Sequence, residues 1–460
     1  MSGTEREATR REFIKYAGAT IAGLVAGGVL GYSVRPVERV AATETVTVLR
    51  TVTAAPSPRE ILELSHWTWN TKIMEETFKI TGALDRFGVK VSIESLTTGQ
   101  VYDRLTTAAA AGTGAPDWVL IENEFVPRFA SIGILRNLED LGADEFAKYF
   151  PKWWVDSGRY KGKIYGMPWD IGPMGIFYRI DLFEKYGLEP LKPGMTWDDV
   201  VEIARQFLKT EGAKEHVFMS FPTNDRGPLT GLIQSVEGKI FERTADGKVK
   251  CVIDTGEALE VIKFVSQLRD EKMITMEPWW TDEWYGKVAD GYYLAIPAGQ
   301  WFGGFLRDWL APKSVGLWRA TSLPYWEKGK PTGGDYGGSC FCITTQTYDE
   351  KAQRAWELIK FLTIDLEGVH ALYKTSGYFP AHQEYLDIIK GITEPYFGGQ
   401  KWLEPFVEEV KYIPTLDYTE FWTHYTGHVG ALLERIAAGE DPVTVVKDVA
   451  SIINGEIAGR

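Results

Sequence analysis

Strands and helices alternate in the apolar pattern that opens the folded part of the chain. Short apolar runs at 61–67 and 117–121 and an alternating run at 89–93 predict strands, whereas longer amphipathic segments at 71–87 and 100–111 predict helices. This βαβαβ order favours parallel pairing, because each helix returns the chain to the same edge of the sheet. The pattern therefore predicts an α/β fold with a doubly wound sheet.

Aromatic and uncharged polar residues gather where the predicted strands end. The three strand ends are Trp67–Asn70, Thr97–Gln100 and Glu122–Glu124. In open α/β sheets, ligands bind beyond the carboxyl ends of the strands. We expect the indole faces, the amides and one pair of acids there to suit a polyhydroxylated or amide-like solute, and to suit phosphate poorly.

Polar residues in front of amphipathic segments mark where later helices begin. Thr196 and Thr347 each precede an acidic residue by three positions, which is the spacing of a capping box. Asp254 or Thr255 is predicted to start another helix, and Asp441, directly before a proline, to cap the last one.

The first residues resemble a twin-arginine export signal. Arg10-Arg11 is followed by an uncharged stretch from Tyr16 to Val34, and Val40-Ala41-Ala42 offers a cleavage site. We assign residues 1–42 to this signal, which would serve as a membrane anchor if it stayed uncut. Residues 43–59 are rich in Thr, Val and Pro and are predicted to form a linker, or a tether if the anchor is kept.

Composition narrows the classes of function. The 460 residues carry a formal charge of −13, and an acidic chain is poorly suited to gripping nucleic acid. Cys251, Cys340 and Cys342 are too few for a disulfide framework, so we predict buried free thiols. The chain contains 17 tryptophans, an abundance that points to aromatic binding surfaces as well as to core.

Familiar catalytic motifs are missing from the sequence. None of the Gly-Lys pairs is followed by Ser or Thr, which excludes a Walker loop, and the Gly-x-Ser-x-Gly elbow is not found. His424 and His428 stand four residues apart, with Glu420 one turn earlier, and such a set could ligate a metal. Gly427 between them favours a plain polar helix face. We therefore predict no metal and no cofactor.

A series of short motifs gives the sequence a family resemblance. Three lie close together, at Tyr160–Pro168, Phe177–Arg179 and Asp181–Leu188. The others are Ala111-Gly112, Pro116-Asp117, Gly133–Leu135, Thr196–Asp198, Gly299–Trp301, Gly337–Ser339 and Gly377–Ala381. In order and spacing the set resembles the extracellular solute-binding proteins of ABC importers, the sugar-binding family that includes maltose-binding protein. The resemblance covers roughly residues 60 to 455; Arg179 departs from it, since the family usually has Asn there.

The resemblance implies a periplasmic-binding-protein-like fold of two α/β lobes joined by three hinge crossings, which close on a solute. It places the first lobe at 60–171 and 323–378, and the second at 172–322 and 379–460. The crossings are expected near Asp170–Gly172, Thr321–Leu323 and Tyr378–Pro380. It also implies a monomeric, non-catalytic receptor, extracellular or periplasmic, that delivers its solute to membrane permease subunits.

Positions that match the family's ligand-binding loops give a candidate site. It consists of Trp67, Trp69, Asn70, Gln100, Asn123, Glu124, Trp169, Asp170, Asn224, Asp225, Arg226, Trp301, Tyr378 and Trp422. Trp301 and Trp422 fall on the family's sugar-stacking positions. An indole offers a flat face for the C–H groups of a pyranose, while carboxylates and amides bond its hydroxyls. Among the other tryptophans, those at 118, 197, 318 and 356 are expected in the core.

Two other functions stay open on the sequence. The first is a receptor of the same fold for a polyamine or another non-sugar solute, because the chain is acidic and aromatic boxes bind cations. Glu124, Asp170 and Asp225 would then gather around the cation. The more distant alternative is a glycoside hydrolase, which needs two facing carboxyl groups about 5–9.5 Å apart.

Overall fold

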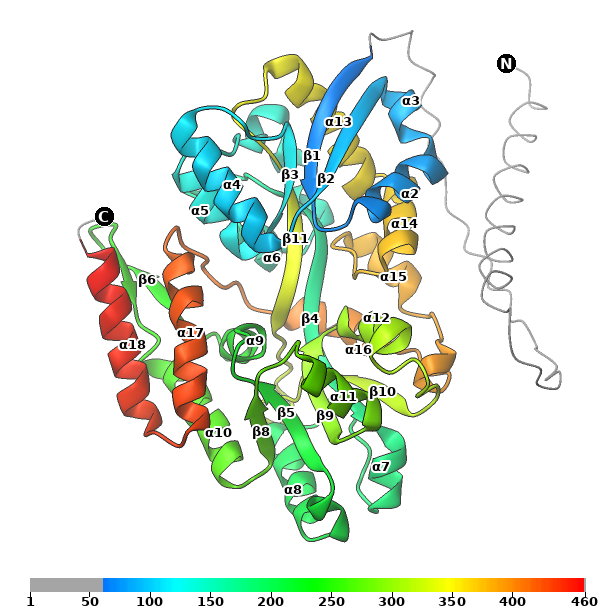
Figure 1. The fold of residues 1–460 in the computed structure, drawn as a ribbon, viewed down its shortest axis with the longest axis vertical. Coiled ribbons are helices and arrows are strands. Elements are labelled where there is room, and N and C mark those ends of the chain that lie inside the picture. The colour runs from blue at the N-terminus through cyan, green and yellow to red at the C-terminus, as the bar shows by residue number, and fades with distance from the viewer. Residues whose placement is uncertain (1–60, 459–460) are drawn as a thin grey trace, which may run out of the picture. The chain divides into compact units, whose positions relative to one another are not determined.

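The computed structural model describes residues 61–458, so the export signal and the linker lie outside the described residues. The first lobe is built from β1 (Leu62–Thr68), α2 (Thr71–Thr81), α3 (Ala83–Phe87), β2 (Val89–Ser95), α4 (Thr98–Ala111), β3 (Trp118–Glu122), α5 (Val126–Ser131), α6 (Lys152–Ser157), β11 (Asp335–Ile343), α13 (Asp349–Thr363), α14 (Leu366–Ser376) and α15 (Gln383–Ile389). Figure 1 shows this lobe in its upper half. Between residues 61 and 458, no helix is long and apolar enough to span a bilayer.

The second lobe contains most of the remaining elements (Figure 1). They are β4 (Met167–Arg179), α7 (Ile180–Lys185), α8 (Trp197–Leu208), β5 (Val217–Pro222), α9 (Gly227–Ser235), β6 (Phe241–Arg243), β7 (Val249–Cys251), α10 (Gly256–Asp270), β8 (Ile274–Glu277), α11 (Asp282–Asp290), β9 (Tyr293–Gly299), α12 (Phe302–Phe305), a π-helix (Leu306–Leu310), β10 (Trp318–Ser322), α16 (Glu404–Glu409), α17 (Trp422–Ala437) and α18 (Pro442–Ile457).

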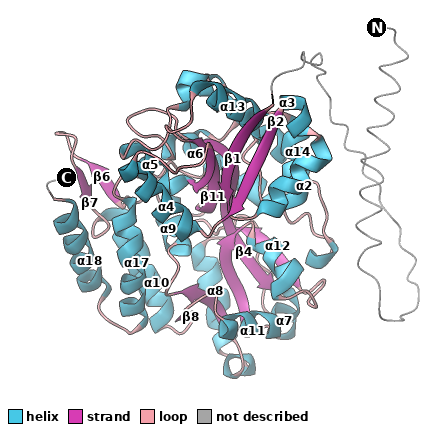
Figure 2. Ribbon diagram, turned by 45° about the horizontal axis from the view of Figure 1, so that its top comes forward, coloured by secondary structure: helices cyan, strands magenta, loops and turns pink. Residues whose placement is uncertain are grey.

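The main strands follow the order β2-β1-β3-β11-β4-β9-β5-β8, with β10 beside β4. In the first lobe β1 pairs in parallel with β2 and β3, and in the second β5 pairs in parallel with β8 and β9. Strands β11 and β4 pair antiparallel to their neighbours and to one another. Helices cover the sheets of both lobes (Figure 2). The expected α/β fold is thus confirmed, and its parallel strands are concentrated within each lobe.

Strands β4 and β11 join the lobes. Met167 of β4 pairs with β11 in the first lobe, and Tyr178 of the same strand pairs with β9 in the second. The return crossing lies at β11, later than the expected Thr321–Leu323. The reason is that the backbone N–H groups of Leu323 and Gly334 still donate to Glu409 of α16, which holds this segment on the second lobe.

A third connection runs along β4. Asp170 bridges Pro380, and the N–H of Ile171 donates to the carbonyl of Phe379 at 2.9 Å. This is the segment where the third crossing is expected. Beyond it, however, α15 still packs on α14 through Tyr385 and Tyr373. The residue bounds of the two lobes stay predictions.

The core contains the tryptophans expected there. Trp118, Trp197, Trp318 and Trp356 are all buried. The three cysteines are buried and unpaired, as predicted. His66 stacks on Trp118 with ring centroids 3.8 Å apart, and burial lowers its pKa to about 3. Many of the tryptophans therefore pack in the hydrophobic core.

Helix boundaries agree with the sequence in part. Thr196 caps α8 in a full capping box and Asp441 caps α18, as expected, while Thr255 is the N-cap residue of α10. The prediction for Thr347 is wrong: α13 begins at Asp349, because the Thr347 hydroxyl donates instead to the carbonyl of Asp117 across the fold. The single helix expected at 71–87 is broken at Gly82, whose φ of 62° is left-handed.

Candidate functional site

An ion pair bridges the two lobes at the carboxyl end of β3. Arg226, just before α9 in the second lobe, donates from Nη2 to Glu124 and, at 3.3 Å, to Glu122 of the first lobe. The guanidinium also lies 5.5 Å from the centre of the Phe125 ring. Its Nε is buried without a hydrogen-bond partner. This ion pair therefore places one cation of the second lobe beside two carboxylates of the first.

Asp225 is the polar centre on the second-lobe side. Its carboxylate accepts hydrogen bonds from the N–H of Gly227 at 2.9 Å, from the indole N–H of Trp280 at 2.8 Å and from the hydroxyl of Tyr336. Burial, reinforced by the charge of Asp225, raises the pKa of Tyr336, so its hydroxyl stays a donor. Asp225 thus fixes the polar edge of Trp280 and ties β11 to the loop before α9.

Two indoles lie side by side next to this centre. The ring of Trp301 is 5.9 Å from that of Trp280, at an interplanar angle of 33°. The indole N–H of Trp301 donates to the carbonyl of Tyr336 at 2.7 Å. Both N–H groups are therefore bound within the protein, and a ligand at this place would meet the ring faces.

The backbone holds Trp280 in an unusual conformation. Its φ of 64° is left-handed, which is strained for a bulky side chain and is often found at functional sites. Asn224 fixes the turn from both sides, donating to the carbonyl of Trp279 and accepting from its N–H. The predicted site residue Asn224 thus positions an aromatic neighbour of the cleft.

Trp169, Asp170 and Tyr378 meet at the hinge. Trp169 stacks on Phe341 and lies 5.4 Å from Tyr378 between ring centres. Asp170 is buried and accepts from the N–H of Ser339 at 2.9 Å, and burial raises its pKa to about 7.

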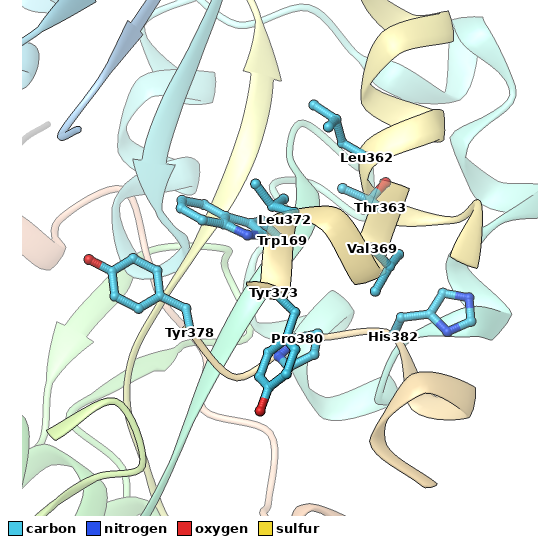
Figure 3. A pocket seen from close by; sticks show the side chains of 9 residues that line it. All are labelled: Trp169, Leu362, Thr363, Val369, Leu372, Tyr373, Tyr378, Pro380 and His382. Carbon is cyan, nitrogen blue, oxygen red and sulfur yellow. The ribbon is translucent and has the colours of Figure 1, made fainter. Parts of the chain in front are cut away.

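A small pocket opens beside this hinge group. Figure 3 shows Trp169, Tyr378 and His382 among the residues that line it. The volume of about 10 Å³ is close to that of one water molecule. This pocket is therefore too small to hold a solute.

The first-lobe candidates mostly have local partners. Asn70 accepts from the N–H of Lys72 and caps α2, and Gln100 closes the capping box of α4 with Thr97. Asn123 is buried and donates to the carbonyl of Trp154 at 3.1 Å. These bonds hold the loops that face the cleft.

The two aromatic candidates on β1 and its following loop differ in burial. Trp67 is buried, with Arg104 stacked 4.0 Å above its ring, while Trp69 is half-buried and its carbonyl accepts from Ser95. Ligand contact by these residues and by the first-lobe loops stays a prediction.

Trp422 lies in the core of the second lobe. Its ring is fully buried against Phe241, Tyr418 and Tyr425, and its N–H has no hydrogen-bond partner. The ring is covered in this arrangement, so its predicted stacking on a ligand stays untested.

The two histidines on α17 face the neighbouring helix. His424 and His428 both contact the carboxylate of Glu456 on α18, at 2.7 and 2.9 Å, while Glu420 pairs with Arg243. No group of three or more His, Cys, Asp or Glu side chains within 61–458 is arranged to hold a metal ion.

Two residues of this site, Tyr336 and Trp280, were not among the predicted site residues, whereas Glu122 was expected with Glu124 as the pair of acids at a strand end. Tyr336 directly precedes the Gly337–Ser339 motif, so it stood beside a recognised signal. Trp280 follows Trp279 in an aromatic cluster without a distinguishing pattern. Only the tertiary contacts separate the half-buried Trp280, whose N–H donates to Asp225, from the fully buried Trp279.

Known proteins resemble this chain over most of its length. The lactose-binding protein of Rhizobium radiobacter is 25% identical over 86% of this chain and 93% of its own. The arabinooligosaccharide-binding protein of Halalkalibacterium halodurans is 23% identical, covering 65% of this chain and 66% of its own.

Solved structures agree with the fold. The ABC transporter-associated binding protein of B. animalis subsp. lactis, in complex with β-1,6-galactobiose, has a TM-score of 0.70 at 27% identity, covering 86% of this chain and 97% of its own. The sugar-binding protein MalE of Xanthomonas citri, at 17% identity over 86% of this chain and 97% of its own, shares the fold with a TM-score of 0.72. The sequence profile described as bacterial extracellular solute-binding protein matches residues 79–396. The chain therefore belongs to the bacterial extracellular solute-binding protein family.

Proposed function

We propose that the protein is an exported receptor that binds a carbohydrate between its two lobes, without catalysing a reaction, and delivers it to the permease of an ABC transporter. Members of its family are exported solute-binding proteins that work with such transporters. The same-fold alternative is a receptor for a polyamine or another non-sugar solute.

The adjacent indoles of Trp280 and Trp301 carry this proposal. Their N–H groups are engaged by Asp225 and by the carbonyl of Tyr336, so only the faces and outer edges remain for a ligand. Such faces match the apolar C–H side of a sugar ring.

The relatives support a carbohydrate as the solute. Proteins named for lactose, arabinooligosaccharide and maltotriose resemble this chain over 64–86% of its length. The structural relative bound to β-1,6-galactobiose shares 27% identity. All of these relatives are binding proteins, and this supports a role without catalysis.

The charges of the cleft favour a neutral solute over a polyamine. Arg226 already pairs with Glu122 and Glu124, and Asp225 already accepts from three donors. The raised pKa of Asp170 weakens it further as a partner for a cation near neutral pH. A polyamine would have to displace the guanidinium and leave that charge uncompensated.

The cellular setting follows from the sequence signals. We propose that residues 1–42 direct export through a twin-arginine signal, and that the protein acts as a monomer outside the cytoplasmic membrane. If the signal is kept, residues 43–59 tether the receptor near its permease, which would raise the local concentration of loaded receptor. Mass spectrometry of the natural N-terminus tests this, because a start near Thr43 would exclude the anchor.

A thermal-shift screen tests the proposed function. The purified protein is heated with mono-, di- and oligosaccharides, and with spermidine as the competing solute. A ligand at about a hundred times its dissociation constant stabilises the fold by about 2.7 kcal/mol, which gives a clear shift. We expect a shift with one class of sugar. A shift with spermidine alone would show that the solute is a cation and contradict a carbohydrate ligand.

A further inference from the structure

A row of aromatic rings leads out of the cleft along the second lobe. Trp301, Phe305 and Trp309 are spaced four residues apart through α12 and the π-helix that follows it, so they lie on one face. Their ring centres are 5.2 Å apart from Trp301 to Phe305 and 5.5 Å apart from Phe305 to Trp309. The rings meet at interplanar angles of 60° and 54°, so they form one contiguous row of tilted rings.

The inner end of the row is the cleft itself. Trp280 contacts both Trp301 and Phe305, with ring centres 5.9 and 6.3 Å apart. Because the N–H of Trp280 is bonded to Asp225, this end is fixed to the polar centre of the site. The row thus starts where the sugar is proposed to bind.

The outer end is open to solvent. Trp309 is 48% exposed, more than any other tryptophan among residues 61–458. Its ring packs edge-on against Tyr285 of α11, with centres 5.1 Å apart, so its position is supported from the side. A supported and partly exposed indole offers a flat amphipathic ring to a solute.

Ion pairs hold the segment that carries Trp309. Arg307 and Asp308 are bonded to each other, with atoms 2.6 and 2.9 Å apart, and Arg307 also reaches Glu394 at 3.2 Å. These bonds tie the helical segment to the chain around Glu394.

A π-helix also lies at this point. The segment Leu306–Leu310, which carries Trp309, follows directly on α12. Single π-turns of this kind are frequent at functional sites. The local backbone is consistent with a role for the Trp309 platform.

We propose that the binding site extends along Trp280, Trp301, Phe305 and Trp309, so that the solute is an oligosaccharide whose outer units stack on Trp309. This inference rests on the proposed function and narrows its substrate class. A mono- or disaccharide held between the lobes would contact the inner rings, whereas a longer chain gains the outer platform.

The test is calorimetric titration with oligosaccharides of rising length. The probes are β-1,6-galacto-, arabino- and malto-oligosaccharides, each from the disaccharide to the hexasaccharide. We expect one series to bind more tightly as the chain lengthens. In Trp309→Ala the ratio of hexasaccharide to disaccharide affinity should fall by about tenfold, because a truncated aromatic anchor commonly weakens binding by that order.

Two further variants separate the possible outcomes. Tyr412→Ala removes an aromatic side chain of similar exposure, 44%, and should keep the length dependence of the wild type. Trp309→Phe should retain part of the length dependence, because it keeps an aromatic ring. If Trp309→Ala keeps the full length dependence while Trp301→Ala loses all binding, the extended site is refuted and the carbohydrate receptor stands. If no sugar binds the wild type, both proposals fall.

Discussion

Asp170 gives the fold a sharp dependence on pH. The carboxyl is buried at the β4 crossing, where it accepts a hydrogen bond from the N–H of Ser339. Loss of hydration is the main cause that raises its pKa to about 7, and the hydrogen bond to the Ser339 N–H acts against it. In the unfolded chain an aspartate titrates near pH 3.9. The folded protein therefore keeps a proton that the unfolded chain loses.

The sign and size of the effect follow from this difference. A raised carboxyl pKa contributes stability that is complete below about pH 4 and is lost as the pH rises through about 7. The full difference corresponds to about 4 kcal/mol. Asp170→Asn is neutral at every pH, so relative to the wild type its free energy of unfolding should rise by up to about 4 kcal/mol between pH 4 and pH 8.

Urea unfolding at pH 4, 6 and 8 measures this difference. Asp335 and Glu409 are also buried carboxyls with raised pKa values, and they shape the pH profile of both proteins. The difference in the free energy of unfolding between Asp170→Asn and the wild type isolates the titration of Asp170, together with its electrostatic coupling to Asp335. A difference that stays constant from pH 4 to pH 8 would refute the assignment of a protonated Asp170.

Three other substitutions test separate parts of the structure. Arg226→Ala leaves Glu124 without its cationic partner across the cleft, so we expect a more open unliganded protein, seen as a larger radius of gyration in small-angle scattering. Gly299→Ala would place a methyl group about 2.4 Å from the Trp301 indole nitrogen, and sugar affinity in calorimetry should fall by about tenfold or more while the protein stays folded. Thr196→Ala removes the hydroxyl that accepts from the N–H of Asp199, while the backbone half of the capping box remains, and it should cost about 1 kcal/mol in urea unfolding without changing affinity.

Local sequence signals predicted helices and strands well where residues close in the chain determine the structure. The apolar run at 61–67 became β1 and the alternating run at 89–93 became β2, because periodicity records which side of a strand is buried. The predicted Thr196 cap is also confirmed, because its hydrogen-bond partner, Asp199, lies only three residues away. Thr347 failed, because its hydroxyl is claimed by a carbonyl 230 residues away.

The cleft was predicted in outline but not in detail. Glu124, Asp225, Arg226 and Trp301 were named from the family resemblance, and tertiary folding brings them together from both lobes. No local pattern identifies Trp280, because its role depends on a left-handed φ and on a bond to Asp225.

Local sequence patterns also did not reveal the hydrogen bonds and packing of some predicted site residues. Asn224 was expected to touch the solute, yet both ends of its amide are used by the Trp279 backbone. Trp422 was expected to stack on a sugar; its ring is buried in this structure, and the contact stays a prediction. Which polar atoms are already satisfied is a property of the packed structure, and a sequence does not record it.

Calorimetric titration of the wild type and of Trp301→Ala tests the central claim most directly. The ligand is the sugar that gives the largest thermal shift, and spermidine is titrated in parallel. We predict one carbohydrate bound per chain, with heat that is lost in Trp301→Ala while the variant's thermal unfolding stays cooperative. Undiminished sugar binding by Trp301→Ala, or binding of spermidine alone, would contradict a carbohydrate site on the indoles between the lobes.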